Sequence, residues 1–267
     1  MVLQIRLDSE EKERVRETIL AKPYSIGPYN VTKGGQQWVR ISEGCPHGCP
    51  WCAEPKQSKW YGMPKPESNQ ISLLDMNLLA HPEALPEIQR MANLKFEGKV
   101  IHFEAICGLD YRFMNLEICQ ALKAARFQNL RIAWDSPLRC QYKLKDAIKL
   151  LVKAGFKRDE ITLFMICNFK YVSFEEQCYK LDLCKVWNVK VADCHFDNQT
   201  GPNFTGIYWK TEEQLEFRAK VRSHNQMIVQ RIYNEQYSRP KIKKFLTMGP
   251  STMDGDILSQ EPVCKGE

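Results

Sequence analysis

Apolar and polar residues alternate along the middle of the chain with two different periods. Short runs rich in Val, Ile, Leu and aromatic residues have the length and composition of strands. Between most of them lie longer stretches in which apolar residues recur every three or four positions, as in amphipathic helices. The predicted strands are 36–42, 70–75, 99–106, 130–135, 160–167 and 189–194, and the predicted helices are 81–93, 113–126, 142–154 and 173–187.

Local signals at the helix ends agree with these bounds. Pro82 stands where a first helical turn tolerates proline. Ser173, followed three positions later by Glu176, has the spacing of a capping box. Gly155 follows the most regular of the amphipathic stretches and suits a helix end. The periodicity and the end signals therefore predict the same elements.

The alternation of strand and helix between about residue 36 and residue 195 predicts a parallel sheet with right-handed crossovers. A complete eight-fold barrel usually needs about 250 residues, more than this segment contains. We therefore expect an α/β fold, a partial (β/α)6 TIM-like barrel that is open on one side. Ligands of such sheets bind at the carboxyl ends of the parallel strands.

The flanking segments predict a simple domain organisation. An N-terminal helix at 8–21 and a loop occupy residues 1–35, and the barrel core covers 36–210. Residues 211–267 begin with a helix of about 25 residues, capped by Thr211, and end in a basic tail rich in Gly, Pro and Ser, which we expect to be mobile.

Composition and charge restrict the class of protein without naming a substrate. Hydrophobic residues make up 43% and charged residues 26% of the 267 positions, as in ordinary globular proteins. No apolar run approaches the length of a membrane span, and the first residues lack the core of a secretory signal. The net charge of +6 permits a polyanionic partner but does not require one. Eleven cysteines in so long a chain fit a reducing cytoplasm, with thiols free or bound to metal.

The most specific chemistry lies directly after the first predicted strand, at residues 44–52. Cys45, Cys49 and Cys52 have the spacing C-x3-C-x2-C, and Gly44, Gly48 and the two prolines of this segment suit a tight loop. A [4Fe–4S] cluster normally takes four thiolates from the protein. Three neighbouring cysteines would therefore leave one iron free for a ligand that is not protein.

This C-x3-C-x-(aromatic)-C pattern resembles the signature of the radical S-adenosylmethionine (radical SAM) superfamily. The resemblance implies a (β/α)6 partial barrel in which the three cysteines hold a [4Fe–4S] cluster and the fourth iron binds the methionine part of SAM. It also implies that one electron, from a donor such as flavodoxin or ferredoxin, cleaves SAM to methionine and a 5′-deoxyadenosyl radical that abstracts a hydrogen atom from the substrate. The protein then binds, orients and shields that radical.

Other interpretations of the cysteines remain open. A zinc site could recruit His47 as a fourth ligand, although ligands so close in sequence strain a tetrahedron. A thioredoxin-like pair, a non-enzymatic iron–sulfur or zinc interaction module, and a SAM-binding regulator that makes no 5′-deoxyadenosine are further alternatives.

The resemblance also implies residues that hold SAM, assigned by their position after each strand. Asp75 and Asn77 follow the second strand, where the family often places a Gly-Gly-Glu-Pro motif that meets the SAM ammonium group; the glycines are missing here. An ordinary strand-end turn is the alternative. Trp51, between the last two cysteines, is expected to reach the adenine.

The later strands supply the remaining contacts in this comparison. Asp135 and Ser136 end the fourth strand, where the family often contacts the ribose, and Arg139 is expected to bind the methionine carboxylate through its bidentate fork. A solvated loop residue is the alternative for Arg139. Met165, in the fifth strand, is expected to line the adenine side.

The third strand is the predicted substrate wall. Glu104 alternates with Phe103 and Ala105, which suit a helix-packed face. An ionisable side chain inside a barrel is costly without a partner or a task, so we expect Glu104 to be catalytic and to face the interior. A loop ion pair is the plain interpretation of Asp110 and Arg112, which follow this strand.

Further cysteines follow strand ends without local ligand spacing. They could hold a second cluster or donate a hydrogen atom, but cysteine is also a common buried residue. These are Cys107, Cys140, Cys167 and Cys194. An open barrel without a large capping domain favours a bulky substrate, such as a nucleic acid or a peptide, and no membrane partner is expected.

Overall fold

The computed structural model of the chain describes residues 27–52, 54–169, 171–196 and 208–236. The predicted helix at 8–21, most of the loop at 196–210 and the basic tail lie outside these described residues. Within them, no helix combines the length and the apolar character that crossing a membrane requires.

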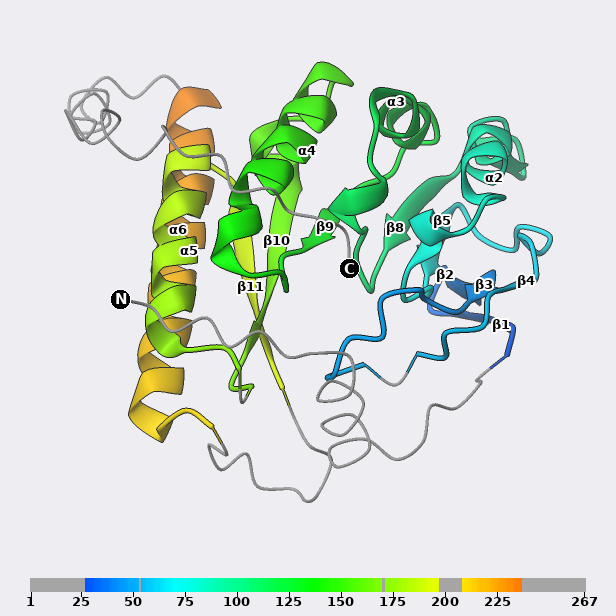
Figure 1. The fold of residues 1–267 in the computed structure, drawn as a ribbon. Coiled ribbons are helices and arrows are strands. Elements are labelled where there is room, and N and C mark those ends of the chain that lie inside the picture. Colours follow the sequence, from blue (N-terminus) through cyan, green and yellow to red (C-terminus); the bar gives the residue numbers. More distant parts are fainter. Residues whose placement is uncertain (1–26, 53, 170, 197–207, 237–267) are drawn as a thin grey trace.

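Strands that run parallel in chain order form the centre of the described structure (Figure 1). β2, β5 and β8 pair in parallel in one sheet, to which β1 adds an antiparallel edge, and β9, β10 and β11 pair in parallel in another. These strands are β1 (Tyr29–Lys33), β2 (Gln36–Arg40), β5 (Gln70–Leu73), β8 (His102–Ala105), β9 (Leu130–Ala133), β10 (Ile161–Cys167) and β11 (Lys190–His195).

The two sheets meet between β8 and β9. Parallel bridges join Phe103 to Phe127 and Leu109 to Ile132, and the phenyl rings of Phe103 and Phe127 stack with their centroids 5.6 Å apart. The predicted parallel α/β fold is therefore confirmed in the described residues, although its hydrogen-bonded ladder is interrupted at this joint. The closure and curvature of a partial barrel remain a prediction.

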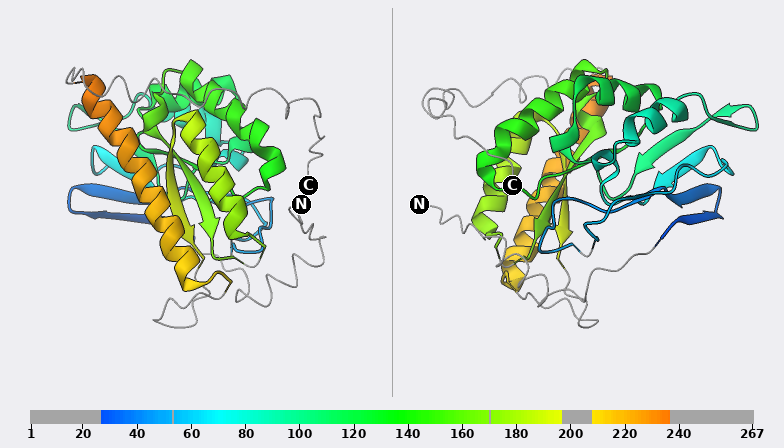
Figure 2. Two further views of the ribbon diagram at one scale, coloured as in Figure 1. Left: turned by 90° about the vertical axis from the view of Figure 1, so that its left-hand side faces the viewer. Right: turned by 45° about the vertical axis from the view of Figure 1, so that its right-hand side comes forward.

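Helices follow each parallel strand except the first, and two small hairpins complete the fold (Figure 2). The helices are α2 (Ala84–Met91), α3 (Leu116–Ala124), α4 (Gln141–Lys153), α5 (Phe174–Trp187) and α6 (Thr211–Gln236). Short 3₁₀ turns precede several of them at Leu78–Ala80, Tyr111–Phe113, Leu138–Cys140 and Arg158–Glu160. The hairpins pair β3 (Ser42–Glu43) with β4 (Lys59–Trp60) and β6 (Lys95–Phe96) with β7 (Lys99–Val100).

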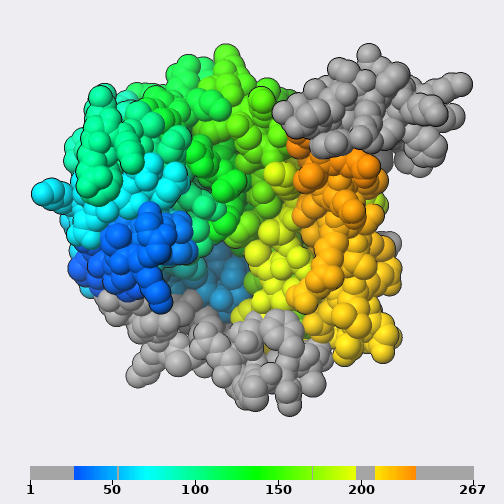
Figure 3. Space-filling view, turned by 180° about the vertical axis from the view of Figure 1, so that it is seen from behind, coloured from blue at the N-terminus to red at the C-terminus, as the bar shows by residue number. Residues whose placement is uncertain are grey.

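Side chains alternate between two unlike faces of these sheets, as the pleat requires. The helix-packed face is mainly apolar and buried; its apolar side chains include Val39, Ile71, Phe103, Ile132, Leu163 and Val191. The opposite face, called here the open face, carries the half-buried side chains of Trp38, Glu104, Arg131, Phe164 and Ala192. Figure 3 shows the surface hollowed between the N-terminal strands and β11.

The far edge of the second sheet is covered by the last helix. Asn225 of α6 accepts a hydrogen bond from the amide of Val191 at 3.0 Å and donates one to its carbonyl at 2.7 Å. A side-chain amide therefore satisfies backbone groups of β11 that would otherwise be open to another strand.

Several element predictions need correction. Residues 29–33 were expected to be loop but form β1, which pairs with β2 across the expected domain boundary at residues 35 and 36. The expected strand at 99–106 is divided between β7 and β8 because the chain turns through a hairpin first. The helix expected from residue 113 begins only at Leu116, because Asn115 caps it by accepting a hydrogen bond from the amide of Ile118.

Candidate metal centre

The cysteine loop connects β3 to β4 and is closed at its base. The amide of Cys45 donates to the carbonyl of Pro55 at 2.9 Å, and the amide of Gly44 donates to Oε1 of Glu54 at 2.7 Å. Arg40 lies within 2.8 Å of both carboxylate oxygens of Glu54, and both side chains are almost wholly buried. A buried ion pair thus links the strand that enters the loop to the chain that leaves it.

Glycine is required at the entrance to the loop. Gly44 has a φ of +104°, and a Cβ atom there would lie 2.3 Å from the carbonyl oxygen of Gln57. No side chain fits this approach without moving the backbone. The glycine that the sequence suggested as a turn residue therefore allows the two ends of the loop to touch.

The three sulfurs lie in one electrostatic environment. Cys45, Cys49 and Cys52 are each half-buried, and Nδ2 of Asn77 lies 3.3 Å from Sγ of Cys45. Burial, together with negative charge on Asp135 and on the two other cysteines, raises the pKa of the Cys49 thiol to about 12, and the charge of Arg112 opposes this shift. Binding a metal at Cys49 would therefore release a proton, as thiolate ligation requires.

The arrangement does not match a site for a single metal ion. Among the described residues, no three His, Cys, Asp or Glu side chains are grouped closely enough to hold one ion. Zinc at about 2.3 Å from each sulfur would need the thiolates within about 4 Å of one another. In a four-iron cluster each thiolate binds a different iron, so that group does not require the three sulfurs to meet at one ion.

Asp110 forms the centre of a polar network beside the loop. Its carboxylate contacts Nε2 of His47 at 2.8 Å, Nδ2 of Asn77 at 3.1 Å, and Nε and Nη2 of Arg112 at 2.8 Å each. The hydrogen bonds from His47 and Arg112 hold the pKa of Asp110 well below its usual range, although burial opposes them. His47 is therefore directed at a carboxylate that follows β8.

Asp75 and Asn77 lie next to this loop, as their positions after β5 predict. Oδ1 of Asp75 accepts hydrogen bonds from the hydroxyl of Ser42 at 2.6 Å and from the amide of Ile41 at 3.1 Å, while Oδ2 is buried without a hydrogen-bond partner. Burial raises the pKa of Asp75 to about 6. Oδ1 of Asn77 is also buried and lacks a hydrogen-bond partner. Both residues thus keep a buried acceptor atom without a partner, and Asn77 does so next to Cys45.

Asp135 and Ser136 lie at the carboxyl end of β9. Burial raises the pKa of Asp135 to about 6, while the nearby charge of Lys180 acts in the opposite direction. Ser136 accepts a hydrogen bond from the hydroxyl of Tyr111 at 2.8 Å, and its carbonyl accepts one from Lys180 at 3.0 Å. Arg139 is half-buried in the 3₁₀ turn that follows.

Trp51 and Met165 differ in their placement. Trp51 is half-buried and packs edge-on against Phe169, which follows β10, with the ring centroids 5.3 Å apart. Met165 is fully buried and shares the helix-packed face with Ile161 and Leu163. The expected place of Met165 on the adenine side therefore needs correction, because the pleat directs Phe164 rather than Met165 to the open face.

Glu104 lies on the open face and is paired. Its carboxylate contacts the guanidinium of Arg131 on β9, and the exposed fraction of the Glu104 side chain is 19%. Arg131 also donates to the carbonyl of Ile106 at 3.0 Å and lies over the ring of Phe164, 5.6 Å from its centroid. Glu104 thus meets a cation on the face opposite the helices.

The four strand-end cysteines are not gathered into a second group. Cys167 is fully buried in β10, whereas the half-buried Cys107, Cys140 and Cys194 lie after β8, after β9 and in β11. None of them belongs to a metal-binding group within the described residues.

Two supports of the loop were not identified from the sequence. Asp110 was interpreted only as a member of a loop ion pair with Arg112, and Glu54 was not singled out. Asp110 contacts His47 and Glu54 contacts Arg40, and neither partner is a close neighbour in the sequence. No local spacing pattern therefore predicts these contacts. The sequence offered only one indication, the charged Glu54 close after the cysteine motif, and an isolated charged residue is weak evidence for a buried contact.

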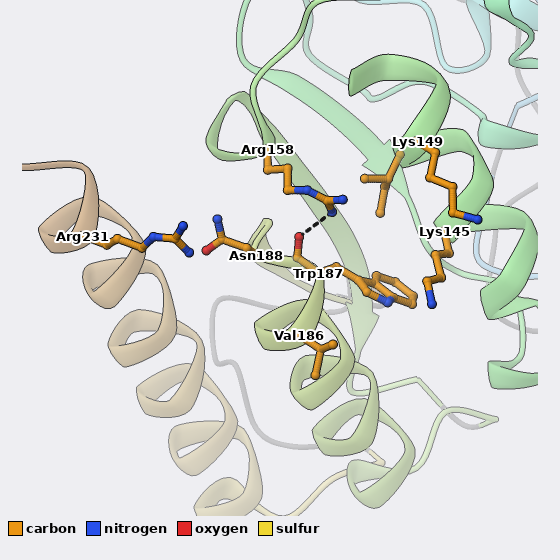
Figure 4. Close-up of a pocket in the computed structure, with 8 residues that line it drawn as sticks. Lys145, Lys149, Arg158, Val186, Trp187, Asn188 and Arg231 are labelled. Atoms are coloured by element: carbon orange, nitrogen blue, oxygen red, sulfur yellow. Dashed lines mark hydrogen bonds between the residues drawn. The ribbon is translucent and has the colours of Figure 1, made fainter. Parts of the chain in front are cut away.

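A separate surface pocket lies at the opposite ends of the strands (Figure 4). Its volume is about 380 Å³, and its lining includes four cationic residues and no carboxylate. Arg158, which precedes β10, donates to the carbonyl of Trp187 at 2.8 Å and so satisfies the end of α5. The other cations are Lys145 and Lys149 of α4 and Arg231 of α6.

Comparison with known proteins gives structural likenesses only. No protein-family profile and no curated protein matches the sequence. The chain is similar to the radical SAM methyltransferase TsrM from Kitasatospora setae, solved with cobalamin and a [4Fe–4S] cluster, with 9% identity and a TM-score of 0.46 over 59% of this chain and 36% of that one.

Two further solved structures have the same degree of likeness. Coproporphyrinogen III oxidase (HemN) from Escherichia coli, a radical SAM enzyme, has 12% identity and a TM-score of 0.43 over 60% of this chain and 41% of its own. HydG, a maturase of the [FeFe]-hydrogenase, has 11% identity and a TM-score of 0.46 over 82% of this chain and 56% of its own. This chain thus spans between about a third and a little over half of the solved chains. Two of these three solved proteins are radical SAM enzymes, and the likeness of this chain to them is one of fold alone.

Proposed function

We propose that the protein is a radical SAM enzyme with one [4Fe–4S] cluster held by Cys45, Cys49 and Cys52. The observation that carries the proposal is a closed loop with three half-buried cysteines at the carboxyl ends of parallel strands. A bound cluster would supply one electron for the cleavage of SAM to a 5′-deoxyadenosyl radical. In this proposal the sheet is the partial (β/α)6 barrel that the sequence predicts.

The chain's own residues would bind and orient SAM. Asp75 and Asn77 offer buried acceptor atoms to an ammonium group, since Oδ2 of Asp75 and Oδ1 of Asn77 have no hydrogen-bond partner. Arg139 would bind a carboxylate through its fork, with Ser136 and Asp135 on the ribose hydroxyls. Trp51, held edge-on by Phe169, would contribute an apolar surface for the adenine.

Glu104 is the proposed catalytic residue on the substrate side. Its pairing with Arg131 is compatible with a purely structural role, because an ion pair between neighbouring strands stabilises both charges. Its place on the open face supports contact with a bound ligand. We expect Glu104→Gln to leave the iron content unchanged and to lower SAM cleavage or substrate turnover at least tenfold. Normal turnover in Glu104→Gln would assign the carboxylate to the ion pair alone.

The proposed substrate is a nucleic acid, with a peptide as the alternative. The basic pocket supports the first, because its four cationic side chains suit phosphate groups, even though one of them, Lys149, is paired with Asp146 at 2.8 Å. Lys145→Gln combined with Lys149→Gln should weaken binding of a short single-stranded RNA and flatten its salt dependence. A matched double change, Lys95→Gln with Lys99→Gln in the β6–β7 hairpin, should not. The physiological electron donor in this proposal is a flavodoxin or ferredoxin of the cytoplasm.

The experiment that tests the function is anaerobic. The protein is reconstituted with iron and sulfide, reduced with dithionite and incubated with SAM and isotopically labelled RNA or peptide pools. We expect 5′-deoxyadenosine to form and to carry label from its true substrate. A protein that holds iron but makes no 5′-deoxyadenosine with any pool would instead favour the SAM-binding regulator. A protein that takes up zinc and no iron would favour the interaction module.

A further inference from the structure

We infer that Asp110 is the positioning residue of the cysteine loop: it fixes His47 inside the motif and holds Asn77 against the sulfur of Cys45. This inference rests on the proposed function only in treating the cysteines as cluster ligands. The contacts themselves are properties of the chain and are present without any bound group.

The carboxylate of Asp110 joins segments that no backbone ladder connects. His47 belongs to the cysteine loop, Asn77 follows β5, and Asp110 and Arg112 follow β8. The exposed fraction of the Asp110 side chain is only 8%, so these hydrogen bonds form away from water, where they are stronger. One buried side chain therefore determines how three strand-end loops lie against one another.

The position of His47 gives this network its effect on the cysteines. His47 stands between Cys45 and Cys49, and its ring also packs against Phe113 at a centroid distance of 5.6 Å. With the ring held on both sides, the backbone between two of the three cysteines has little freedom to rotate. The loop is then preorganised before a cluster binds, which is what a precise ligand set requires.

Asn77 and Arg112 connect the same carboxylate to the sulfurs. The amide group of Asn77 is shared between Oδ2 of Asp110 at 3.1 Å and Sγ of Cys45 at 3.3 Å. The guanidinium of Arg112 is held by the same carboxylate, with its Nε 2.8 Å from Oδ1 of Asp110. Hydrogen bonds and positive charge near cluster sulfurs raise a cluster's reduction potential. Asp110 would therefore influence both the loop and the electron-accepting property of its cluster.

A second group of the same composition provides the matched control. Asp193 on β11 contacts His195 at 3.0 Å and Arg218 of α6 at 3.2 Å, away from the cysteine loop. Asp193→Asn removes the same charge from the same kind of neighbours. Any general effect of losing a buried carboxylate should appear in both variants.

The test uses the full-length, metal-free, reduced protein and N-ethylmaleimide. Alkylation rates at individual cysteines are followed by mass spectrometry. We expect Asp110→Asn to raise the rates at Cys45 and Cys49 about tenfold or more, because local opening exposes them. Asp193→Asn should change them less than twofold. Unchanged rates in Asp110→Asn, or equal acceleration in both variants, would overturn the inference.

A second variant and a second measurement keep the inference testable if Asp110→Asn does not fold. If Asp110→Asn also exposes the fully buried Cys119 and Cys184, the variant His47→Phe decides: it should accelerate alkylation at Cys45 and Cys49 while Cys119 stays protected. In the reconstituted protein, Asn77→Leu should lower the reduction potential of the cluster, and an unchanged potential would contradict the contact with Cys45. Failure of wild-type protein to bind iron would refute the proposed function and leave the alkylation result standing.

Discussion

Two groups of His, Asp and Arg occur at different places on the sheets, and they join different kinds of elements. His47, Asp110 and Arg112 lie on strand-end loops around the cysteines, whereas His195, Asp193 and Arg218 join β11 to α6. In both groups hydrogen bonds from the neighbours lower the pKa of the carboxyl. The difference is in what is joined. The second group joins a strand to the helix that packs on it, while the first joins the cysteine loop to the loops that follow β5 and β8.

The largest expected difference between the two regions concerns iron. The variants Cys45→Ala, Cys49→Ala and Cys52→Ala should each lose most of the cluster iron, because each thiolate binds a separate iron. Each should also lose all SAM cleavage activity. Cys194→Ala, next to Asp193, should leave both unchanged. Iron and sulfide analysis after reconstitution measures the effect. Full iron content in any of the three loop variants, or loss of iron in Cys194→Ala, would show that the cluster is bound by other residues.

The second expected effect is on the stability of the loop region. Glu54→Gln breaks the buried pair with Arg40 and should lower the free energy of unfolding by about 3–5 kcal/mol. Asp146→Asn breaks the exposed pair with Lys149 and should cost less than about 1 kcal/mol. Urea denaturation followed by circular dichroism compares them. Similar costs for the two variants would mean that the buried pair does not close the loop.

The third expected effect is on SAM binding. Arg139→Ala should weaken SAM affinity on the order of ten- to a hundredfold, since a bidentate carboxylate contact contributes about 1.5–3 kcal/mol. Arg218→Ala, from the second group, should leave the affinity unchanged. Isothermal titration calorimetry of the reconstituted protein with SAM gives both values. If Arg139→Ala bound SAM as tightly as the wild-type protein, the SAM carboxylate would be bound by a cation other than Arg139.

The smallest expected effect is on the pH dependence of stability. Both carboxyls have a folded-state pKa below the unfolded value of about 3.9, so their contribution is present above that pH and is lost as pH falls through the folded pKa. The melting temperature should fall by about 2–4 °C in Asp110→Asn at pH 7, and this deficit should shrink below about pH 4. Asp193→Asn should show a smaller deficit, because Asp193 is more exposed. A deficit that grows on acidification would contradict the assignment.

The parallel fold could be predicted because its information is local. Strand periods, the capping of α5 by Ser173 and the order of elements all follow from neighbouring residues, and the structure confirms them. β1 was missed because its five residues are all exposed and show no buried alternation. Its strand conformation depends on pairing with β2 rather than on its own pattern.

The candidate site divides in the same way. The cysteine spacing marks Cys45, Cys49 and Cys52 directly, because their role is encoded in a short segment. Met165 was misplaced because a one-residue shift along a strand reverses the face on which a side chain lies. The contact of Glu54 with Arg40 spans 14 positions and that of Asp110 with His47 spans 63, and only the folded chain brings these side chains together.

The most direct test of the central claim is the electron paramagnetic resonance spectrum of the reduced, reconstituted protein with and without SAM. Three cysteine ligands leave one iron open, so the account predicts about four irons per chain and a [4Fe–4S]⁺ signal that changes when SAM is added. A colourless protein that binds zinc instead, or a cluster signal that SAM does not alter, would contradict the claim that this loop holds a cluster open to SAM.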